Sequence, residues 1–289
     1  MLINSLKTAL QLIHVHPILW IFIVISFLTG SFTELAIIFS IVLLHELGHY
    51  IAATAFKWRI SAIILWAFGG VMKTDEHGTR PVREEAIVIL AGPFVQVLIY
   101  GLLYGISSFG IIPEYYYALI FYYNTIILLF NLLPIWPLDG GKLIFLVLTT
   151  FLTFKKAFYA TIIASLAICA VIILTQILFF PFTLSSFLIW LFLIHENRKE
   201  WKYRFYVFIR FLLKRYEGGH FVRAIKPIYA SSQDSFLDVL ARFHREKKHT
   251  IYIEYPDKER VSVEDNECLA FYFNERPYRK TIGESFTGY

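Results

Sequence analysis

The chain has 289 residues, of which 57% are hydrophobic and only 17% are charged, and its mean hydropathy is +0.58. These values exclude an ordinary soluble globular protein, which exposes more charge, and they predict an integral membrane protein. The formal net charge is +5 and the pI is about 9.0. Lys and Arg crowd into the last third of the chain, from Arg198 onward, so we expect a membrane domain followed by a smaller soluble domain.

The N-terminal stretch and the cysteines limit the compartment. One early lysine, Lys7, precedes the first apolar run, and no small-residue cleavage site follows it, so we expect no cleavable signal peptide. Cys169 lies in an apolar run and Cys268 in the polar tail, so we expect no disulfide framework. Basic loops in a membrane protein mark the cytoplasmic side, and we expect no direct nucleic-acid partner.

Six apolar segments are predicted to cross the bilayer, which makes the chain a polytopic α-helical membrane protein. They cover residues 17–28 with part of the lead before them, 35–56, 86–106, 115–133, 157–179 and 183–194. The loops after the first, third and fifth segments carry no Lys or Arg, whereas the other loops carry almost all of them. This alternation predicts that both termini are cytoplasmic. A five-span fold would put the basic tail outside and is disfavoured.

Two apolar pieces are too short to span comfortably. Residues 60–70 lie inside a long basic loop and are predicted to form a re-entrant or strand-like excursion. Residues 143–152 end at Lys155 and Lys156, and they predict a short partial or interfacial helix.

The tail reads as a compact α/β module. A strand is predicted over residues 224–229, an amphipathic helix over 235–246 and a second strand over 250–255, in a β-α-β-β-α order. The apolar face of this helix carries Phe236, Leu237, Leu240 and Phe243. We therefore expect a membrane domain over residues 1–195, a linker over 196–221 and a tail domain over 222–289.

The stretch IVLLHELGHY, residues 41–50, sets two histidines and a glutamate in an apolar run. His45 and His49 are four residues apart, so on a helix they lie on one face, one turn apart. That spacing lets two imidazoles bind one metal ion, and Glu46 is placed to act as the general base. This is H-E-x-x-H, a zinc metalloprotease pattern. Because ionisable residues are costly inside a membrane, we expect them to be functional.

A third ligand is needed, since catalytic zinc takes three protein ligands and keeps one position open. Asp139, in the stretch PLDGG beside the end of an apolar span, supplies it. Two structural alternatives stay open here. Asp139 is equally suited to cap a helix or a turn before Gly140 and Gly141, and Lys142 is near enough to pair with it. Glu46 could instead be a hydrogen bonder between packed helices.

Three other residues of the spans attract attention. Asn124 and Asn131 are polar residues on the fourth span, which leads to Asp139. Either of them orients a ligand, contacts substrate or simply forms an interhelical hydrogen bond. Gly48, inside the histidine pattern, is predicted to permit close approach of another helix.

Together these residues resemble a family. HELGH on a span, AGP at residues 91–93 opening a later span, PLDGG after a third span and FGG at residues 68–70 are similar to the site-2 protease family of intramembrane zinc metalloproteases. The IHVHP lead, residues 13–17, and LLPIWPLDGGK, residues 132–142, resemble its sporulation branch, the stage IV sporulation protein FB type. The resemblance covers nearly the whole chain.

The resemblance implies that the protein cleaves a peptide bond in or near a transmembrane segment. In this branch the substrate is the membrane-tethered precursor of a late mother-cell sigma factor, pro-sigma-K. The enzyme acts in the mother-cell membrane around the forespore and is held inactive by partner membrane proteins, and a homo-oligomer is a further expectation. The tail resembles a single CBS domain, which in this branch binds ATP.

Carried over by position, His45, His49 and Asp139 become zinc ligands and Glu46 the catalytic acid/base. The segment 68–70 becomes an edge strand for extended substrate. The candidates for substrate contact are Phe68, Gly69, Gly70, Asn124, Asn131 and Pro137. The frequent N-P-D-G of the family reads W-P-L-D-G here, which leaves the identity of an assisting asparagine open.

Two other functions compete with a peptidase. One is a transporter or channel with a regulatory tail, in which His45, Glu46 and His49 form an ion path. It predicts charges on several spans and paired repeats, and the sequence has neither. The other is a di-iron membrane oxidase, which needs many clustered histidines, whereas only His45 and His49 lie in the middle of a predicted span.

Overall fold

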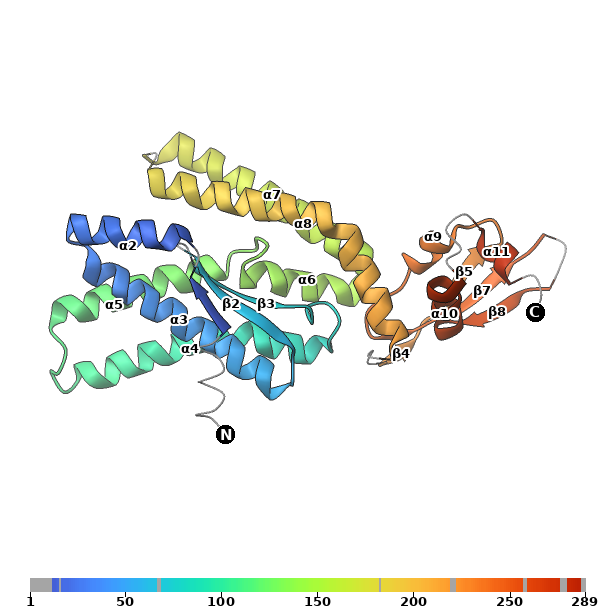
Figure 1. Cartoon of the computed structure of the whole chain (residues 1–289), viewed down its shortest axis with the longest axis horizontal. Helices are drawn as coiled ribbons and strands as arrows, with labels where there is room; N and C mark the ends of the chain where they lie inside the picture. The colour runs from blue at the N-terminus through green and yellow to red at the C-terminus, as the bar shows by residue number, and fades with distance from the viewer. Residues whose placement is uncertain are drawn as a thin grey trace. The chain divides into compact units, whose positions relative to one another are not determined.

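The structure is a computed structural model that describes residues 12–15, 17–66, 69–181, 183–218, 222–256, 259–275 and 280–286. The chain divides into two compact units. The first takes in Met1–His77, Arg83–Pro134 and Leu138–Gly140, and the second Gly78–Val82, Ile135–Pro137 and Gly141–Tyr289. Figure 1 labels the helices and strands of both units along the chain.

The first unit is built around one long helix, α3 (Phe32–Ala55). Gly30, with a φ of 75°, ends α2 (Pro17–Thr29) and lets the chain turn into α3. α3 packs against α2, against α5 (Glu114–Asn131) and against two strands. α4 (Val82–Ser107) supplies the remaining long helix of this unit, and α6 (Asp139–Phe151) starts here. The histidine pattern therefore lies on the helix with the most neighbours.

A small sheet covers part of α3. β1 (Ile13–Val15) runs parallel to β2 (Ile60–Trp66), and β2 pairs antiparallel with β3 (Gly69–Thr74). Ile63 of β2 is buried in a cluster with Tyr50 of α3, which anchors the sheet to the helix. The strand-like excursion predicted for residues 60–70 is thus a hairpin. Within the described residues, β3 pairs on one side only and is an edge strand (Figure 1).

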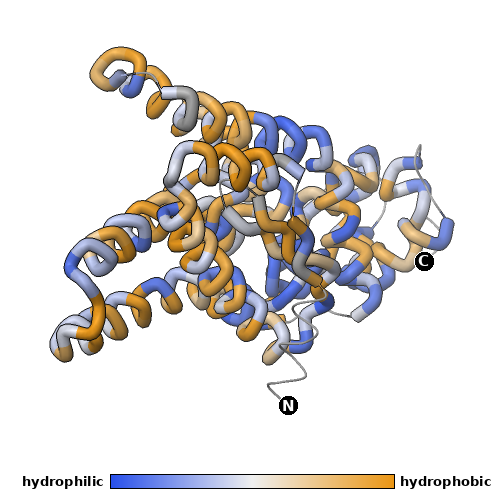
Figure 2. Tube along the Cα trace, turned by 60° about the vertical axis from the view of Figure 1, so that its left-hand side comes forward, coloured by the Kyte–Doolittle hydropathy of each residue, from blue (hydrophilic) through white to orange (hydrophobic). Residues whose placement is uncertain are grey.

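Among the residues that the structure describes, three helices are long and apolar enough to cross a membrane: α3, α4 and α7 (Phe154–Phe179). A shorter apolar helix covers Leu19–Thr29. α5 falls on the fourth predicted span, and α8 (Leu184–Tyr216) contains the sixth. In Figure 2 the helices are largely orange, the colour of hydrophobic residues, and the tail carries more blue. The chain is a mostly helical membrane protein, and the count of six spans stays a prediction.

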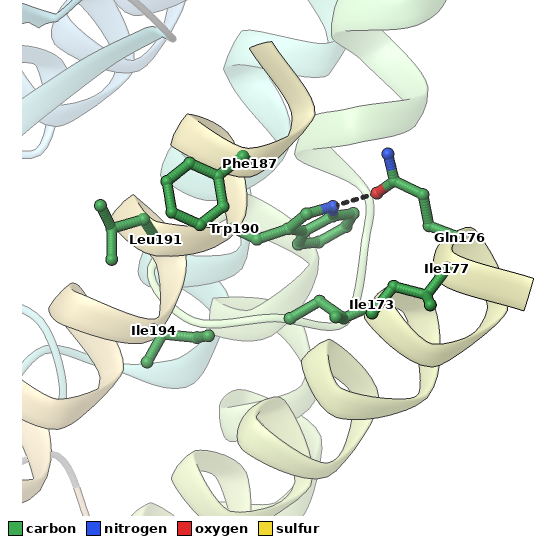
Figure 3. Close-up of a pocket in the computed structure, with 7 residues that line it drawn as sticks. All are labelled: Ile173, Gln176, Ile177, Phe187, Trp190, Leu191 and Ile194. Atoms are coloured by element: carbon green, nitrogen blue, oxygen red, sulfur yellow. Dashed lines mark hydrogen bonds between the residues drawn. The ribbon is translucent and has the colours of Figure 1, made fainter. Parts of the chain in front are cut away.

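In the second unit α7 and α8 form a pair. Near one end, Phe154 of α7 stacks on Phe211 of α8 with ring centroids 4.0 Å apart. Near the other end is a hollow of about 140 Å³ (Figure 3). It is lined by Ile173, Gln176, Ile177, Phe187, Trp190, Leu191 and Ile194. Its polar groups satisfy one another, because Trp190 Nε1–H donates to Gln176 Oε1 at 2.6 Å. The seven lining residues include no charged side chain.

The tail is a small α/β structure. β5 (Ile228–Ser231) lies parallel to β7 (Thr250–Glu254), which pairs antiparallel with β8 (Val261–Glu264). A second, two-stranded sheet joins β4 (Ala224–Ile225) and β6 (Lys247–Lys248). The helices of the tail are α9 (Phe236–Leu240), α10 (Asp265–Glu275) and α11 (Ile282–Ser285).

The helix predicted over residues 235–246 is shorter than expected, because α9 ends at Leu240. The next backbone N–H groups, of Arg242 and Phe243, bond to carbonyls three residues back rather than four. These tight turns rotate Phe243 into the core, where it is fully buried. Burying this aromatic ring stabilises the tail more than further helical backbone hydrogen bonds would.

The end of α8 is fixed to the tail by a buried ion pair. Arg215 Nη2 lies 2.5 Å from Asp265 Oδ2, and both side chains are almost fully buried. Arg215 also donates to the backbone carbonyls of His244, at 3.2 Å, and Lys247. These bonds satisfy a charge that would otherwise be costly to bury. They tie the last long helix to the tail sheet.

We predict that the tail loses stability in mild acid. His249 Nδ1–H donates to the carbonyl of Lys226 and its Nε2 accepts from the backbone of His244, so the ring is satisfied only when neutral. Burial lowers the pKa of His249 to about 4. An unfolded histidine binds its proton near pH 6.5, so between about pH 6.5 and 4 the unfolded state gains stability. The folded tail should lose up to about 3 kcal/mol in this window.

Pulse proteolysis of the purified chain in urea, read with an antibody to the C-terminus, measures this loss. His249→Gln should reduce the dependence on pH without removing it, because burial also lowers the pKa of His244 to about 4. Replacing the exposed His195 with Gln should leave the dependence as in the wild type. An unchanged pH slope in His249→Gln would contradict the assignment.

Candidate metal centre

α3 presents the three residues of the histidine pattern at its buried side. His45, Glu46 and His49 are each 5% exposed or less. The helix can lie close to α4 here because Gly48 has no side chain: a Cβ at Gly48 would meet the carbonyl oxygen of Ala91 at 2.6 Å. The close approach predicted for Gly48 is confirmed, and it brings α4 against both histidines.

Asp139 reaches the same place from the first turn of α6. A helix N-terminus stabilises an acid, so the sequence favours a carboxylate here for helix formation as well. The loop before it is tightly folded, since a Cβ at Gly140 would meet the carbonyl oxygen of Leu132 at 2.2 Å. Because Gly140 has no side chain, the start of α6 can pack against this backbone, and the Asp139 carboxylate, which is 3% exposed, lies beside the histidines.

The three predicted ligands converge. His45 Nε2 and His49 Nε2 are 3.0 Å apart, and Asp139 Oδ2 lies 3.1 Å from each of them. Zinc binds nitrogen and carboxylate oxygen at about 2.0–2.2 Å, so ligand atoms that share one ion lie about 3–3.5 Å apart. The triangle formed by His45, His49 and Asp139 therefore has the size and the donor set of a three-ligand zinc site.

The hydrogen bonds at Nδ1 of His45 and of His49 determine which nitrogen of each ring carries the lone pair. His49 Nδ1 lies 2.7 Å from the carbonyl oxygen of Val88, and His45 Nδ1 lies 3.0 Å from Gln96 Oε1. Both partners accept hydrogen bonds, so both Nδ1 atoms carry the hydrogen and both Nε2 atoms carry a lone pair. Two lone pairs and a carboxylate oxygen then point at one buried spot. Such acceptors repel each other unless a cation lies between them.

Two glycines leave room for these side chains. On β3, a Cβ at Gly70 would meet Glu46 Cγ at 2.3 Å, so the edge strand lies directly beside Glu46. On α4, a Cβ at Gly92 would meet His49 Nε2 at 2.4 Å and His45 Cε1 at 2.7 Å. The strand β3 therefore lies against Glu46 and the helix α4 against the two histidines. A larger residue at Gly70 or Gly92 would displace these side chains.

The residues predicted to contact substrate lie in different parts of the structure. Gly69 and Gly70 begin β3, and Gly69 has a φ of 151°, which favours glycine. Phe68 lies outside the described residues. Asn131 is the last residue of α5 and is part-buried. Pro137 belongs to the second unit, so it is not among the residues that the first unit gathers at the centre.

Asn124 is fully buried and does form an interhelical hydrogen bond, to the backbone carbonyl of Gln96 at 3.0 Å. Gln96 itself was not predicted, nor was the carbonyl of Val88. The contact of the Val88 carbonyl cannot be predicted from the sequence, because every residue has a backbone carbonyl. Gln96 could have been noticed, because it is a lone polar amide in an apolar helix, one turn after Gly92. Such residues are expensive in a membrane and mark functional places.

We predict that Gly92→Ala displaces the two imidazoles and lowers the zinc content of the purified protein by about tenfold or more, as disturbance of the shell around a metal does. Gly101→Ala is the matched control, because it lies on the same helix and a Cβ there meets nothing within 4 Å. Plasma mass spectrometry of both purified variants measures the zinc. Equal zinc content in the two variants would rule out the crowding argument.

Comparisons with known proteins agree with this geometry. Peptidase family M50 matches residues 33–112 and 107–174. Stage IV sporulation protein FB of Bacillus subtilis is 36% identical over 278 residues, which cover 96% of each chain. A zinc metalloprotease of Methanocaldococcus jannaschii is 34% identical over 111 residues, 37% of this chain and 32% of that one.

The fold has a solved counterpart. The structure of the site-2 protease from Methanocaldococcus jannaschii matches with a TM-score of 0.53 and 27% identity, covering 65% of this chain and 89% of that one. The long match to the Bacillus subtilis protein and the family match over the histidine pattern point the same way. The chain belongs to peptidase family M50, the site-2 protease family of intramembrane zinc metalloproteases.

Proposed function

We propose that this protease cleaves a membrane-tethered protein precursor near its transmembrane segment, with His45, His49 and Asp139 as zinc ligands and Glu46 as the catalytic acid/base. The observation that carries the assignment is the convergence of two Nε2 atoms and one carboxylate oxygen, 3.0–3.1 Å apart and buried, on the helix that also carries Glu46. No cluster of this kind other than His45, His49 and Asp139 occurs among the described residues.

Each residue has a distinct part in hydrolysis. A bound zinc ion supplies Lewis acidity, which polarises the scissile carbonyl and lowers the pKa of water to about 7. His45, His49 and Asp139 would hold the ion, and this ligand set carries one negative charge, that of the Asp139 carboxylate. Glu46 accepts the proton of the attacking water and returns it to the leaving amine.

The edge strand β3 is the proposed place for substrate. A peptide bond inside a helix is already hydrogen-bonded and shielded, so cleavage needs an extended conformation. An exposed strand edge stabilises an added strand through backbone hydrogen bonds. Gly70 of β3 lies against Glu46, so a peptide paired with this strand passes close to the general base. We include Phe68, Gly69 and Asn131 as neighbouring contacts, and Pro137 in the segment before Asp139.

The name of the Bacillus subtilis relative supports a role in sporulation. We propose the sporulation sigma-factor precursor pro-sigma-K as the substrate and the mother-cell membrane around the forespore as the location. Six spans with cytoplasmic termini follow from the basic-loop pattern. Inhibitory partner membrane proteins and a homo-oligomer belong to the same proposal. So do the domain boundaries at residues 195 and 221, a CBS-like tail and ATP as its ligand.

Glu46→Gln should lower cleavage by at least about 100-fold, because the amide cannot take up the proton, while the zinc content stays at the wild-type level. Co-expression with a tethered sigma-factor precursor, followed by gel analysis of the products, measures cleavage. Cleavage at the wild-type rate in this variant would refute the protease mechanism.

Asp139→Asn should weaken zinc binding by at least about tenfold, because a neutral amide replaces the only anionic ligand. Competition with a chelator on the purified variant measures the affinity. Asp234→Asn, which alters a partly exposed tail carboxylate paired with Arg242, serves as the control and should keep the wild-type affinity. Full zinc affinity in Asp139→Asn would remove Asp139 from the ligand set.

A further inference from the structure

Two buried amides join α4 to α5 behind the metal centre. Gln96 and Asn124 are both fully buried. They bond reciprocally: Asn124 Nδ2–H donates to the backbone carbonyl of Gln96 at 3.0 Å, and Gln96 Nε2–H donates to the backbone carbonyl of Asn124 at 3.4 Å. Amides are expensive to bury in a membrane helix, so a packing role alone is a poor reason for this pair.

The pairing determines which way the Gln96 amide points. The carbonyl of Asn124 can only accept a hydrogen bond, so the Gln96 atom facing it must be the NH₂ group. The other end of the amide, Oε1, then faces His45 Nδ1 at 3.0 Å. Because Oε1 only accepts, the hydrogen of His45 must sit on Nδ1 and the lone pair on Nε2, the atom that faces Asp139.

The two histidines are held in different ways. The Nδ1 of His49 bonds to a backbone carbonyl, that of Val88, which any residue at that position would supply. The Nδ1 of His45 bonds to a side chain, that of Gln96, whose NH₂ group in turn donates to the backbone carbonyl of Asn124. His45 is therefore the histidine whose ring orientation and tautomer are set by a replaceable side chain, and that side chain is Gln96.

We propose that Gln96 is a positioning residue that fixes the ring and the tautomer of His45 for metal binding. The backbone carbonyl of Asn124 sets the direction of the Gln96 amide, and the Asn124 side chain holds α5 against α4 at this point. The proposal rests on the proposed function, in which His45 is a zinc ligand. It assigns Asn124 to the support of a ligand rather than to substrate contact.

The test uses the purified full chain in detergent. Gln96→Leu keeps the volume but removes the acceptor, and the zinc affinity should fall 10–100-fold, the usual cost of losing an outer partner of a ligating histidine. Gln96→Glu keeps an acceptor for Nδ1–H but turns a second oxygen toward the carbonyl of Asn124, so it should restore only part of that affinity. Asn124→Leu should cause a smaller fall than Gln96→Leu, because the backbone carbonyl that orients the Gln96 amide remains and only the hydrogen bond from the Asn124 side chain to α4 is lost. Competition with a chelator measures all three.

A matched control separates positioning from packing. Tyr100 Oη and Thr125 Oγ1 also join α4 to α5, at 2.8 Å, and neither hydrogen bond of this pair involves a histidine. Tyr100→Phe should therefore keep the wild-type zinc affinity. Cobalt substitution adds a second readout, since the visible absorption of bound cobalt reports ligand geometry and should change in Gln96→Leu but not in Tyr100→Phe.

The outcomes distinguish this proposal from the proposed function. Wild-type zinc affinity and an unchanged cobalt spectrum in Gln96→Leu overturn the positioning role alone, as does an equal loss in Tyr100→Phe. If His45→Ala binds zinc as tightly as the wild type, the ligand assignment itself fails, and the positioning role fails with it.

Discussion

The rest of the structure has to hold together three acceptor atoms that repel one another. His45 Nε2, His49 Nε2 and Asp139 Oδ2 face one another across 3.0–3.1 Å in a buried place, and each of these atoms carries lone pairs. Without a cation the arrangement is unfavourable, so the surrounding protein must hold it together. A divalent ion turns the same convergence into a binding site. The folded protein thus holds the three atoms in place, and a bound metal would supply the attraction between them.

α4 does most of this holding. One face of the helix presents the Val88 carbonyl, Gly92 and the Gln96 side chain in successive turns, and all three meet the imidazoles. The first and last fix the hydrogens on the outer nitrogens, and the glycine lets the rings lie against the helix backbone. Gly48 on α3 allows the two helices this close approach. The mostly apolar helix α4 therefore has one face that contacts the two imidazoles.

The sequence was enough to single out His45, His49 and Asp139, which the structure brings together, because a spacing of four on a helix and an acid at the end of an apolar segment are local patterns. It also indicated the strand-like excursion at residues 60–70. It did not indicate Gln96, whose importance depends on the direction in which a second helix turns its amide. Nor did it place the end of α9, because the pull of Phe243 into the tail core is a tertiary effect that exceeds local helix preference.

α8 runs without interruption from Leu184 to Tyr216, across the boundary at which the sequence changes from apolar to charged. At about 1.5 Å per residue such a helix is a rod of about 50 Å, and bending it breaks backbone hydrogen bonds. Arg215 clamps its far end to Asp265 of the tail. The tail therefore cannot rotate independently of α8, and a force that turns the apolar first half of this helix also turns the tail.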